Sequence, residues 1–514
     1  MNVLCRRGFL KGSALSALGC AINLSFLREL GHAAAGETAV DPDEVRFGPG
    51  IDPLVALIQT TSRDKCVPTF ITQLQAGLSY QRFLASVFLA ALRTGDPHQV
   101  AQVYAAHRVG SEARIEERLL PLFWALDRVN DAYQTDGNQG REAALRTLTG
   151  SLPTANSAAS VLADAMAQHD PDLSERSVVA LARSSGARSA MVRLWEFAPR
   201  SVGGTLGHPA IALANGVRTL DAMGWQHAEP VMRYAARYVG SMRGDNTHAS
   251  NLELARRTVP WLPAGWAASA GPRAATLELY AALRECPAAD ASSWICSRLS
   301  TGEATAGPVW DAIHLAAADL LFRHSTGGSV IGGFLIHVVT TTNALRFGFD
   351  LAEEPRTRML CILQAAGMIC DFFVARARNE GLLRKMSLLD LGLEGAGQSS
   401  DLGEVFDRLP AKADGLEQKL PEDRKKSDDA CRRAFALLRD PKNEQAFLQT
   451  ARGFLCAKAS RNPHDVKYPA AAFEDAYSTS PEWRPYLLAS SVHALHGSKS
   501  DDAAVLVQAR DALR

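Results

Sequence analysis

The sequence predicts an all-α protein, a multi-helix array of packed helical hairpins without a regular repeat. Apolar residues recur at helical spacing through most of the chain. The segments with this spacing end at helix-breaking pairs such as Asp170-Pro171 and Gly271-Pro272. We find no convincing run of alternating apolar and polar residues of the kind that marks a strand. No segment recurs at a fixed period, so a regular solenoid is not supported.

The first helix expected from this spacing covers residues 73–93. Its apolar side chains stand at Leu74, Leu78, Phe83 and Val87, a pattern that places them on one face of a helix. The same spacing predicts helices over residues 117–129, 158–168, 175–184, 210–223, 229–241, 274–284, 309–322, 333–349, 355–378, 428–438, 444–457 and 486–496.

The composition is that of an ordinary soluble globular protein. The 514 residues are 47% hydrophobic and 21% charged, with 55 basic and 55 acidic side chains, which leaves no net charge to attract a polyanion. No basic stripe with interleaved aromatic residues is present, so we expect no nucleic-acid partner. After the first 35 residues no stretch of about twenty apolar residues occurs, so we expect no membrane span in the mature chain.

Residues 1–35 have the three parts of a twin-arginine signal peptide in the right order. Arg6-Arg7 stands in a positively charged start, an apolar stretch follows, and the alanines at 33–35 supply the small residues that a signal peptidase needs. We therefore expect export of the folded chain by the twin-arginine translocation machinery, to a periplasmic or extracytoplasmic location. Lipidation at Cys20 stays open as the alternative to cleavage near Ala35.

Two stretches of the chain have the composition of linkers. One follows the signal and is rich in Gly, Pro and Asp, and the other carries charges of both signs, as solvated loops do. The expected organisation is a signal peptide at 1–35, a linker at 36–52, a helical core domain at 53–386, a charged linker or loop at 387–430, and a C-terminal helical segment at 431–514 packed on the core.

The cysteines argue against a thiolate metal site. Seven lie beyond the signal, and no C-x-x-C pair is found among them. Cys286 and Cys296 flank a short loop-like segment and are the best candidates for a disulfide.

Histidines are the most informative polar residues, because several lie in segments that otherwise resemble core helices. His208 stands before Pro209 at a helix start, and His227 with Glu229 stands before Pro230 at the next one. The helix between them spans about 20 Å at 1.5 Å per residue, so the two histidines cannot share a site if that helix is straight. Either one could instead meet a residue from elsewhere in the chain.

Further segments carry polar groups that could belong to a pocket. His337 lies inside an apolar helix and must find a partner, because an unpaired buried imidazole is costly. Asp311 and His314 share a helix face, as an acid–base pair or as an ordinary helix-start acid beside a histidine. Residues 462–469 are loop-like and could cap a pocket or form a surface turn. His107 is a fourth helical histidine.

Two interpretations of the histidines remain open. Each could be satisfied separately in the core or on the surface, or two or more of His107, His208, His227 and His337 could form an active or metal site. The chain lacks H-E-x-x-H, paired E-x-x-H, G-x-S-x-G, G-x-G-x-x-G and P-loop motifs. The absence of these motifs argues against zincins, di-iron bundles, α/β-hydrolases and the common nucleotide-binding folds.

The helix start Gly207-His208-Pro209, followed by the later segment from Ile336 to Thr340, resembles the questin oxidase-like proteins. The resemblance covers about residues 75–375, and the helix that begins at Tyr80, with His107 after it, fits the same layout. It implies a helical, cofactor-poor oxygenase of Baeyer–Villiger type, acting on polyketide quinones with NADPH. His208 and His337 would then be pocket residues.

The chain departs from that family in its export signal, because NADPH is scarce outside the cytoplasm. The string from Trp225 to Pro230 is more similar to uncharacterised exported bacterial proteins with a twin-arginine signal. The signal therefore favours a bound metal, or no cofactor, over NADPH.

From these observations we expect an exported all-helical oxidoreductase, of the questin oxidase-like oxygenase kind, that acts on an aromatic or polyketide-like substrate through a histidine-lined pocket. The expected catalytic residues are His208, His337 and His107, and the expected metal ligands are His208, His227, Glu229 and His337. Imidazole with carboxylate suits iron, copper or zinc. The alternative is a non-catalytic helical binding or scaffold protein of the cell envelope, whose histidines share no cavity.

Overall fold

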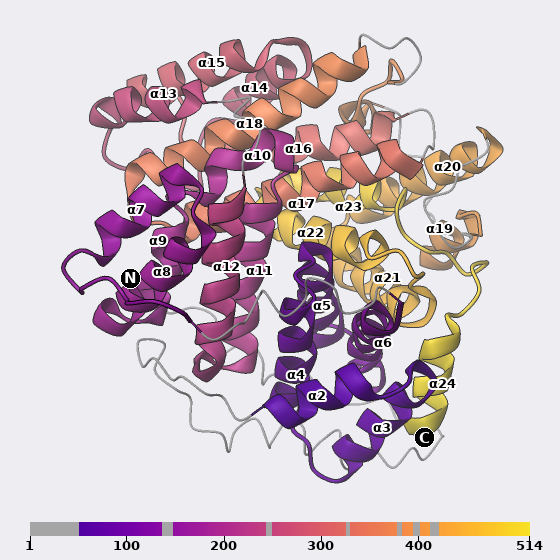
Figure 1. The fold of residues 1–514 in the computed structure, drawn as a ribbon. Helices are drawn as coiled ribbons and strands as arrows, with labels where there is room; N and C mark the ends of the chain where they lie inside the picture. The colour runs from indigo at the N-terminus through magenta and orange to yellow at the C-terminus, as the bar shows by residue number, and fades with distance from the viewer. Residues whose placement is uncertain are drawn as a thin grey trace.

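The structure, a computed structural model, confirms the all-α class (Figure 1). It describes residues 51–135, 148–242, 249–324, 329–377, 383–393, 401–411 and 421–513. Within these ranges the chain forms helices and turns, and the single β-type contact is an isolated bridge between His324 and Leu383. The expected signal peptide and most of the linker after it lie outside the described residues.

No helix in the described part of the chain is both long enough and apolar enough to cross a membrane.

The helices follow one another along the chain with short connections. They are α2 (Asp52–Thr60), α3 (Arg63–Gln75), α4 (Tyr80–Arg93), α5 (Pro97–Ser111), α6 (Leu120–Thr135), α7 (Ala158–Gln168), α8 (Pro171–Ser185), α9 (Ala187–Leu194), α10 (Val202–Thr205), α11 (His208–Met223), α12 (Ala228–Ser241), α13 (Ser250–Thr258), α14 (Arg273–Glu285), α15 (Ala288–Thr301), α16 (Ala306–Arg323), α17 (Ser329–Leu351), α18 (Pro355–Ala377), α19 (Leu402–Arg408), α20 (Pro421–Leu438), α21 (Glu444–Lys458), α22 (His464–Ser478), α23 (Arg484–Ser491) and α24 (Ala504–Leu513).

The helix expected over residues 73–93 is two helices in the structure. α3 ends at Gln75, and Gly77 adopts a left-handed φ of +100° that a helix interior does not allow. Ser79 then caps α4, because its Oγ accepts a hydrogen bond from the backbone N–H of Arg82 at 3.3 Å. A glycine and a capping serine thus outweigh the continuous apolar spacing.

Several helices lie where no helix was expected. α5 begins at Asp96-Pro97, where the aspartate caps the helix and proline occupies its first position. The polar run at 462–469, expected as a loop, contains the start of α22. The segment 387–430, expected as a charged linker or loop, contains α19 and the start of α20, although residues 394–400 and 412–420 lie outside the described residues.

Cys286 and Cys296 are free thiols, so the expected disulfide between them is wrong.

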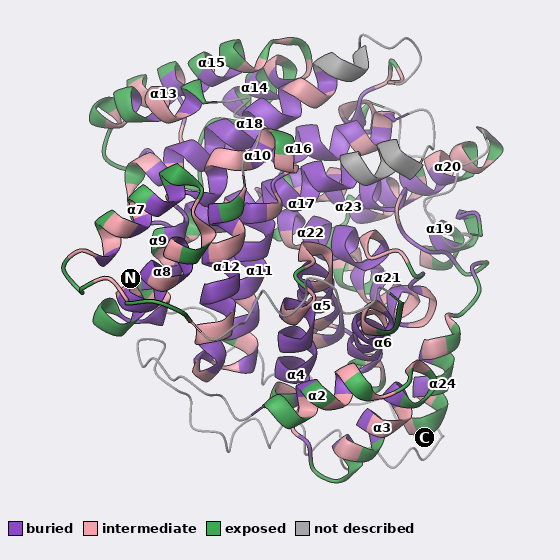
Figure 2. Ribbon diagram, in the orientation of Figure 1, coloured by how far each residue is buried: buried purple, intermediate pink, exposed green. Residues whose placement is uncertain are grey.

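Four helices form a closed ring in the middle of the molecule. α5 packs on α11, α11 on α17, α17 on α22, and α22 back on α5. The centre of α17 is buried on every side, since each residue from Leu335 to Leu345 is buried (Figure 2), which is the pattern of a helix surrounded by other helices. The remaining helices cover this ring, so side chains on its inner faces are held by neighbours from four directions.

A glycine sets the closest approach within the ring. Gly207, the residue before α11, has a φ of +73°, and a Cβ atom there would overlap the side chain of Thr341 on α17. The Thr341 hydroxyl donates a hydrogen bond to the carbonyl oxygen of Leu206 at 2.8 Å. The start of α11 is therefore fixed directly against α17, one turn after His337.

Gly207→Ala should destabilise the protein more than Gly95→Ala. Both glycines have a φ of +73°, but nothing lies within 4 Å of the Cβ position at Gly95. Gly95→Ala is expected to cost only backbone strain of about 1 kcal/mol, whereas Gly207→Ala should cost about 1–3 kcal/mol more because Thr341 must move. Urea unfolding measures both free energies. Equal losses in the two variants would contradict the close approach.

Candidate metal centre

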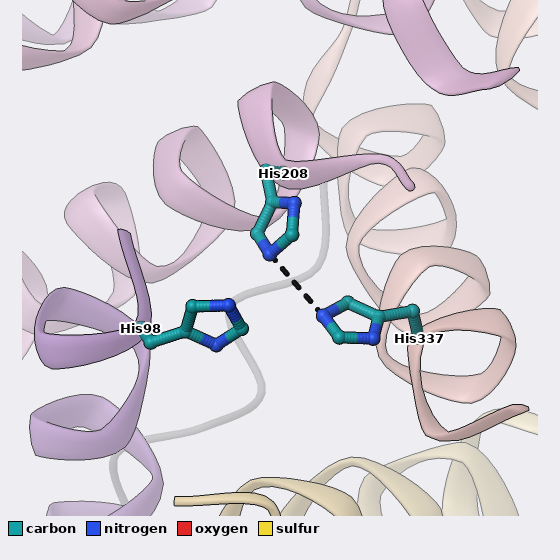
Figure 3. Close-up of side chains that lie close together, drawn as sticks. All are labelled: His98, His208 and His337. Carbon is teal, nitrogen blue, oxygen red and sulfur yellow. Dashed lines mark hydrogen bonds between the residues drawn. The ribbon is translucent and has the colours of Figure 1, made fainter. Parts of the chain in front are cut away.

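Three histidines from three helices of the ring meet at one point (Figure 3). His98 lies in the first turn of α5, His208 is the first residue of α11, and His337 lies on α17. One ring nitrogen from each lies within 4.8 Å of the nitrogens of the other two. The Nε2 atoms of His208 and His337 are 3.2 Å apart. We refer to these three residues as the histidine centre.

The ring of a fourth histidine packs against the histidine centre. His464, the first residue of α22, has its ring centroid 5.0 Å from that of His337 and 5.4 Å from that of His98. The ring of four helices therefore contributes one histidine from each member. Three of the four lie in the first turn of their helix, where the helix dipole is positive and disfavours a charged imidazolium.

Hydrogen bonds determine which nitrogen carries the proton in two of the rings. His208 Nδ1 lies 2.6 Å from the carbonyl oxygen of Thr205, so it must donate, and Nε2 keeps its lone pair. His464 Nδ1 lies 2.8 Å from Asn462 Oδ1, an oxygen that also accepts from the backbone N–H of His464 at 3.0 Å. His464 Nε2 is therefore unprotonated, and this buried atom has no hydrogen-bond partner among the described residues.

A buried lysine contacts the third ring. Lys467, only 4% exposed, places Nζ 2.8 Å from His98 Nδ1. Burial lowers the pKa of this lysine to about 7, because a charged amine is poorly solvated there. The neutral amine can accept a hydrogen bond from His98 Nδ1–H, which leaves the lone pair of His98 on Nε2, the nitrogen that points towards His208 and His337 (Figure 3).

Burial favours the neutral form of three of these imidazoles, those of His98, His208 and His464. Burial, and next the charge of Lys467, lowers the pKa of both His98 and His464 to about 2. Burial also lowers the pKa of His208, although its hydrogen bond to Thr205 acts in the opposite direction. Neutral imidazole is the form that ligates metals, since a proton and a metal compete for the same lone pair.

The spacing suits a transition-metal ion. Two nitrogens that bind one tetrahedral ion at about 2.0–2.1 Å are about 3.3 Å apart, close to the 3.2 Å between His208 and His337. The other nitrogen–nitrogen distances, which reach up to 4.8 Å, would need to shorten by as much as about 1.5 Å to match this spacing. Histidine ligands usually donate their second N–H to an oxygen, which His208 and His464 both do.

The structure brings together two of the residues predicted from the sequence and separates the others. His208 and His337 are both in the histidine centre. His107 lies on α5 about 14 Å along the helix from His98 and contacts the Tyr80 hydroxyl at 2.8 Å through Nδ1.

The other two predicted ligands, His227 and Glu229, follow the far end of α11, about 22 Å of helix from His208. His227 is 4% exposed, and Glu229 accepts a hydrogen bond from Arg233 at 3.3 Å. Neither is in the histidine centre.

Sequence reasoning missed His98, and it included His464 and Lys467 only in a loop-like run that could cap a pocket or form a surface turn. A shared local signal could have indicated the two histidines, because Asp96-Pro97-His98 and Asn462-Pro463-His464 are the same helix-start pattern of a capping side chain, a proline and a histidine. Gly207-His208-Pro209 is a related start with the last two residues exchanged. Histidine beside proline at three helix starts is thus the feature that links them.

Comparison of the chain with protein-family models, with curated proteins and with solved structures returned no match. The resemblance to questin oxidase-like proteins therefore stays a prediction, and the argument for function depends on the geometry described above.

The buried His227 should make the protein less stable in acid. Burial, with Arg82 adding to it, lowers the pKa of His227 to about 4, whereas the unfolded chain has an ordinary value near 6.5. Below that value the unfolded state binds a proton that the folded state does not, so stability present at neutral pH is lost as the pH falls towards 4. His227 alone should account for about 2 kcal/mol at about pH 5.

Urea unfolding of wild type and His227→Leu at about pH 7 and pH 5 tests this expectation. The variant should lose less free energy between the two pH values than the wild type. His169→Asn is the matched control, because His169 is exposed and asparagine tolerates its positive φ of 54°. A pH dependence unchanged in His227→Leu would contradict the assignment.

Proposed function

We propose that this protein is a metal-dependent oxidoreductase whose metal ion is bound by His98, His208 and His337. The observation that carries the proposal is the convergence of three imidazoles from three helices on one point. The hydrogen bond from His208 Nδ1 to the carbonyl oxygen of Thr205 leaves the Nε2 lone pair facing the same point. His464 is the proposed fourth ligand, since its buried Nε2 has no other partner among the described residues.

The donor set favours copper over iron. Non-haem iron oxygenases typically use two histidines and a carboxylate, and the histidine centre contains imidazoles alone. All-nitrogen sets suit copper and zinc. A bound copper ion supplies one-electron redox chemistry, which matches the oxidoreductase expected from the sequence, and we propose copper for that reason.

The surrounding residues would favour an anionic or electron-rich exogenous ligand at the metal. The first turns of α5, α11 and α22 present their positive dipole ends to the centre, and Lys467 lies against His98. His98 and His208 are only partly buried, so a small molecule can approach from their side. An aromatic or polyketide-like substrate remains the proposal that the family resemblance implies.

The expected twin-arginine route is compatible with this proposal, because a chain that folds before export can load its metal first.

The alternative of a non-catalytic scaffold protein expects histidines that share no site. Four histidines packed together give no support to that alternative.

Purified protein should bind one copper ion per chain, and Cu(II) should give an electron paramagnetic resonance spectrum with nitrogen couplings. His208→Ala and His337→Ala should each weaken copper binding by about 100-fold or more, because each removes a ligand. His464→Ala should weaken it less, since His464 is not one of the three histidines whose nitrogens lie within 4.8 Å of one another. Equilibrium dialysis with metal analysis measures the affinities.

His227→Leu is the control for these variants, because it removes a buried histidine outside the centre. It should bind copper as the wild type does. Loss of binding in this control to the same degree, or the absence of stoichiometric copper in the wild type, would contradict the metal centre. Binding of zinc in strong preference to copper, without copper reduction by ascorbate, would contradict the oxidoreductase.

A further inference from the structure

A second site lies at the other end of the same helices. A cleft of about 830 Å³ opens among α5, α11, α17, α21 and α22, a size typical of pockets for small organic ligands. Four arginines line it, namely Arg108, Arg218, Arg346 and Arg452. We refer to it as the arginine cleft.

The arginine cleft has one positive charge in excess. Its lining carries three carboxylates, from Glu112, Asp350 and Glu474, against the four guanidinium groups. Burial opposes ionisation of Glu474, but Arg218 and Arg108 overcome this and lower its pKa, so it stays charged. The cleft therefore attracts one negative charge, and a second would meet nearby carboxylates.

Glu474 holds two of the four arginines, Arg108 and Arg218, in place and leaves some of their N–H donors unused. It accepts hydrogen bonds from Arg108 Nε at 2.9 Å, from the Tyr104 hydroxyl at 2.5 Å and from Asn343 Nδ2 at 3.2 Å. Arg218 donates to Asn343 Oδ1 at 2.7 Å. A guanidinium group has five N–H donors, so these contacts leave others for a ligand.

Apolar groups also line the arginine cleft. Phe347 lies beneath Arg218, with the guanidinium carbon 4.4 Å from the ring centroid. Leu448 and the ring of Tyr477 contribute further apolar surface. The lining thus combines planar cationic donors with surfaces on which an organic body can pack.

We infer that the arginine cleft is a binding site for a small organic carboxylate. The guanidinium fork matches a carboxylate with two parallel hydrogen bonds. The single excess charge fits a monoanion better than a phosphate dianion, and the apolar walls fit a carbon skeleton better than an inorganic ion.

The arginine cleft is separate from the histidine centre. Arg108 follows His98 by ten residues on α5, and Arg218 follows His208 by ten residues on α11, a rise of about 15 Å in each helix. Between the two sites lies a cavity of about 20 Å³ that Lys467, Asn343 and Glu474 help to line. That volume holds about one water molecule, so an organic ligand in the cleft stays in the cleft.

Isothermal titration of the full chain, first treated with a chelator, tests the inference without any contribution from a metal. Benzoate is the probe, benzamide is its neutral match, and inorganic phosphate is the competing anion. Benzoate should bind with one site per chain, benzamide should not bind, and phosphate should bind more weakly than benzoate. Arg346→Gln and Arg108→Gln should each weaken benzoate binding by about tenfold or more, since each removes a charged donor.

Arg273→Gln is the charge-matched control, because Arg273 is exposed and pairs with Glu482 away from the cleft lining. It should bind benzoate as the wild type does. The partner of Arg346, Asp350, is 53% exposed, so Arg346→Gln should fold, and circular dichroism checks this for both cleft variants. Equal binding of benzamide, tighter binding of phosphate, no binding of benzoate, or unchanged affinity in both folded variants would overturn the inference.

Discussion

The close contact between the start of α11 and the middle of α17 is the constraint on which the histidine centre depends. Because Gly207 has no side chain, the backbone before His208 can lie directly against Thr341. His337 is one turn away on α17, so this contact sets the distance between the two imidazoles. α17 in turn is held by close packing, because its centre is buried on all sides. The site is therefore fixed by packing in the core and not by a flexible loop.

Electrostatics and burial act on this centre in the same direction. Helix dipoles, Lys467 and the loss of water all disfavour an imidazolium ion. The cost of burying these polar rings is partly offset by their hydrogen bonds to Thr205 and Asn462. What remains is the lone pair of His464 Nε2, buried and without a partner among the described residues. A buried acceptor in this state is costly in a purely structural cluster, and a bound metal ion would remove that cost.

Sequence periodicity predicted the fold class and most helices because apolar spacing records burial directly, as in α7, whose expected and observed limits coincide. It failed at α3 and α4, where Gly77 and Ser79 end and start helices within a continuous apolar pattern. It failed at α22 because Asn462, His464 and Lys467 resemble loop residues when burial is unknown. His208 and His337 could be singled out as unusual residues in apolar helices. The proximity of His208 and His337 could not be predicted, because it depends on packing between segments about 130 residues apart.

The histidine centre and the arginine cleft share one architecture. All four helices of the ring run from the centre towards the cleft, so the residue ten positions after each histidine lines the cleft: Arg108, Arg218, Phe347 and Glu474. On α22, Lys467 and Glu474 are seven residues apart and so lie on one face. Lys467 contacts His98, and Glu474 pairs with Arg108 and Arg218. α22 therefore carries residues of both sites, with His464 and Lys467 in its first turns and Glu474 further along the helix.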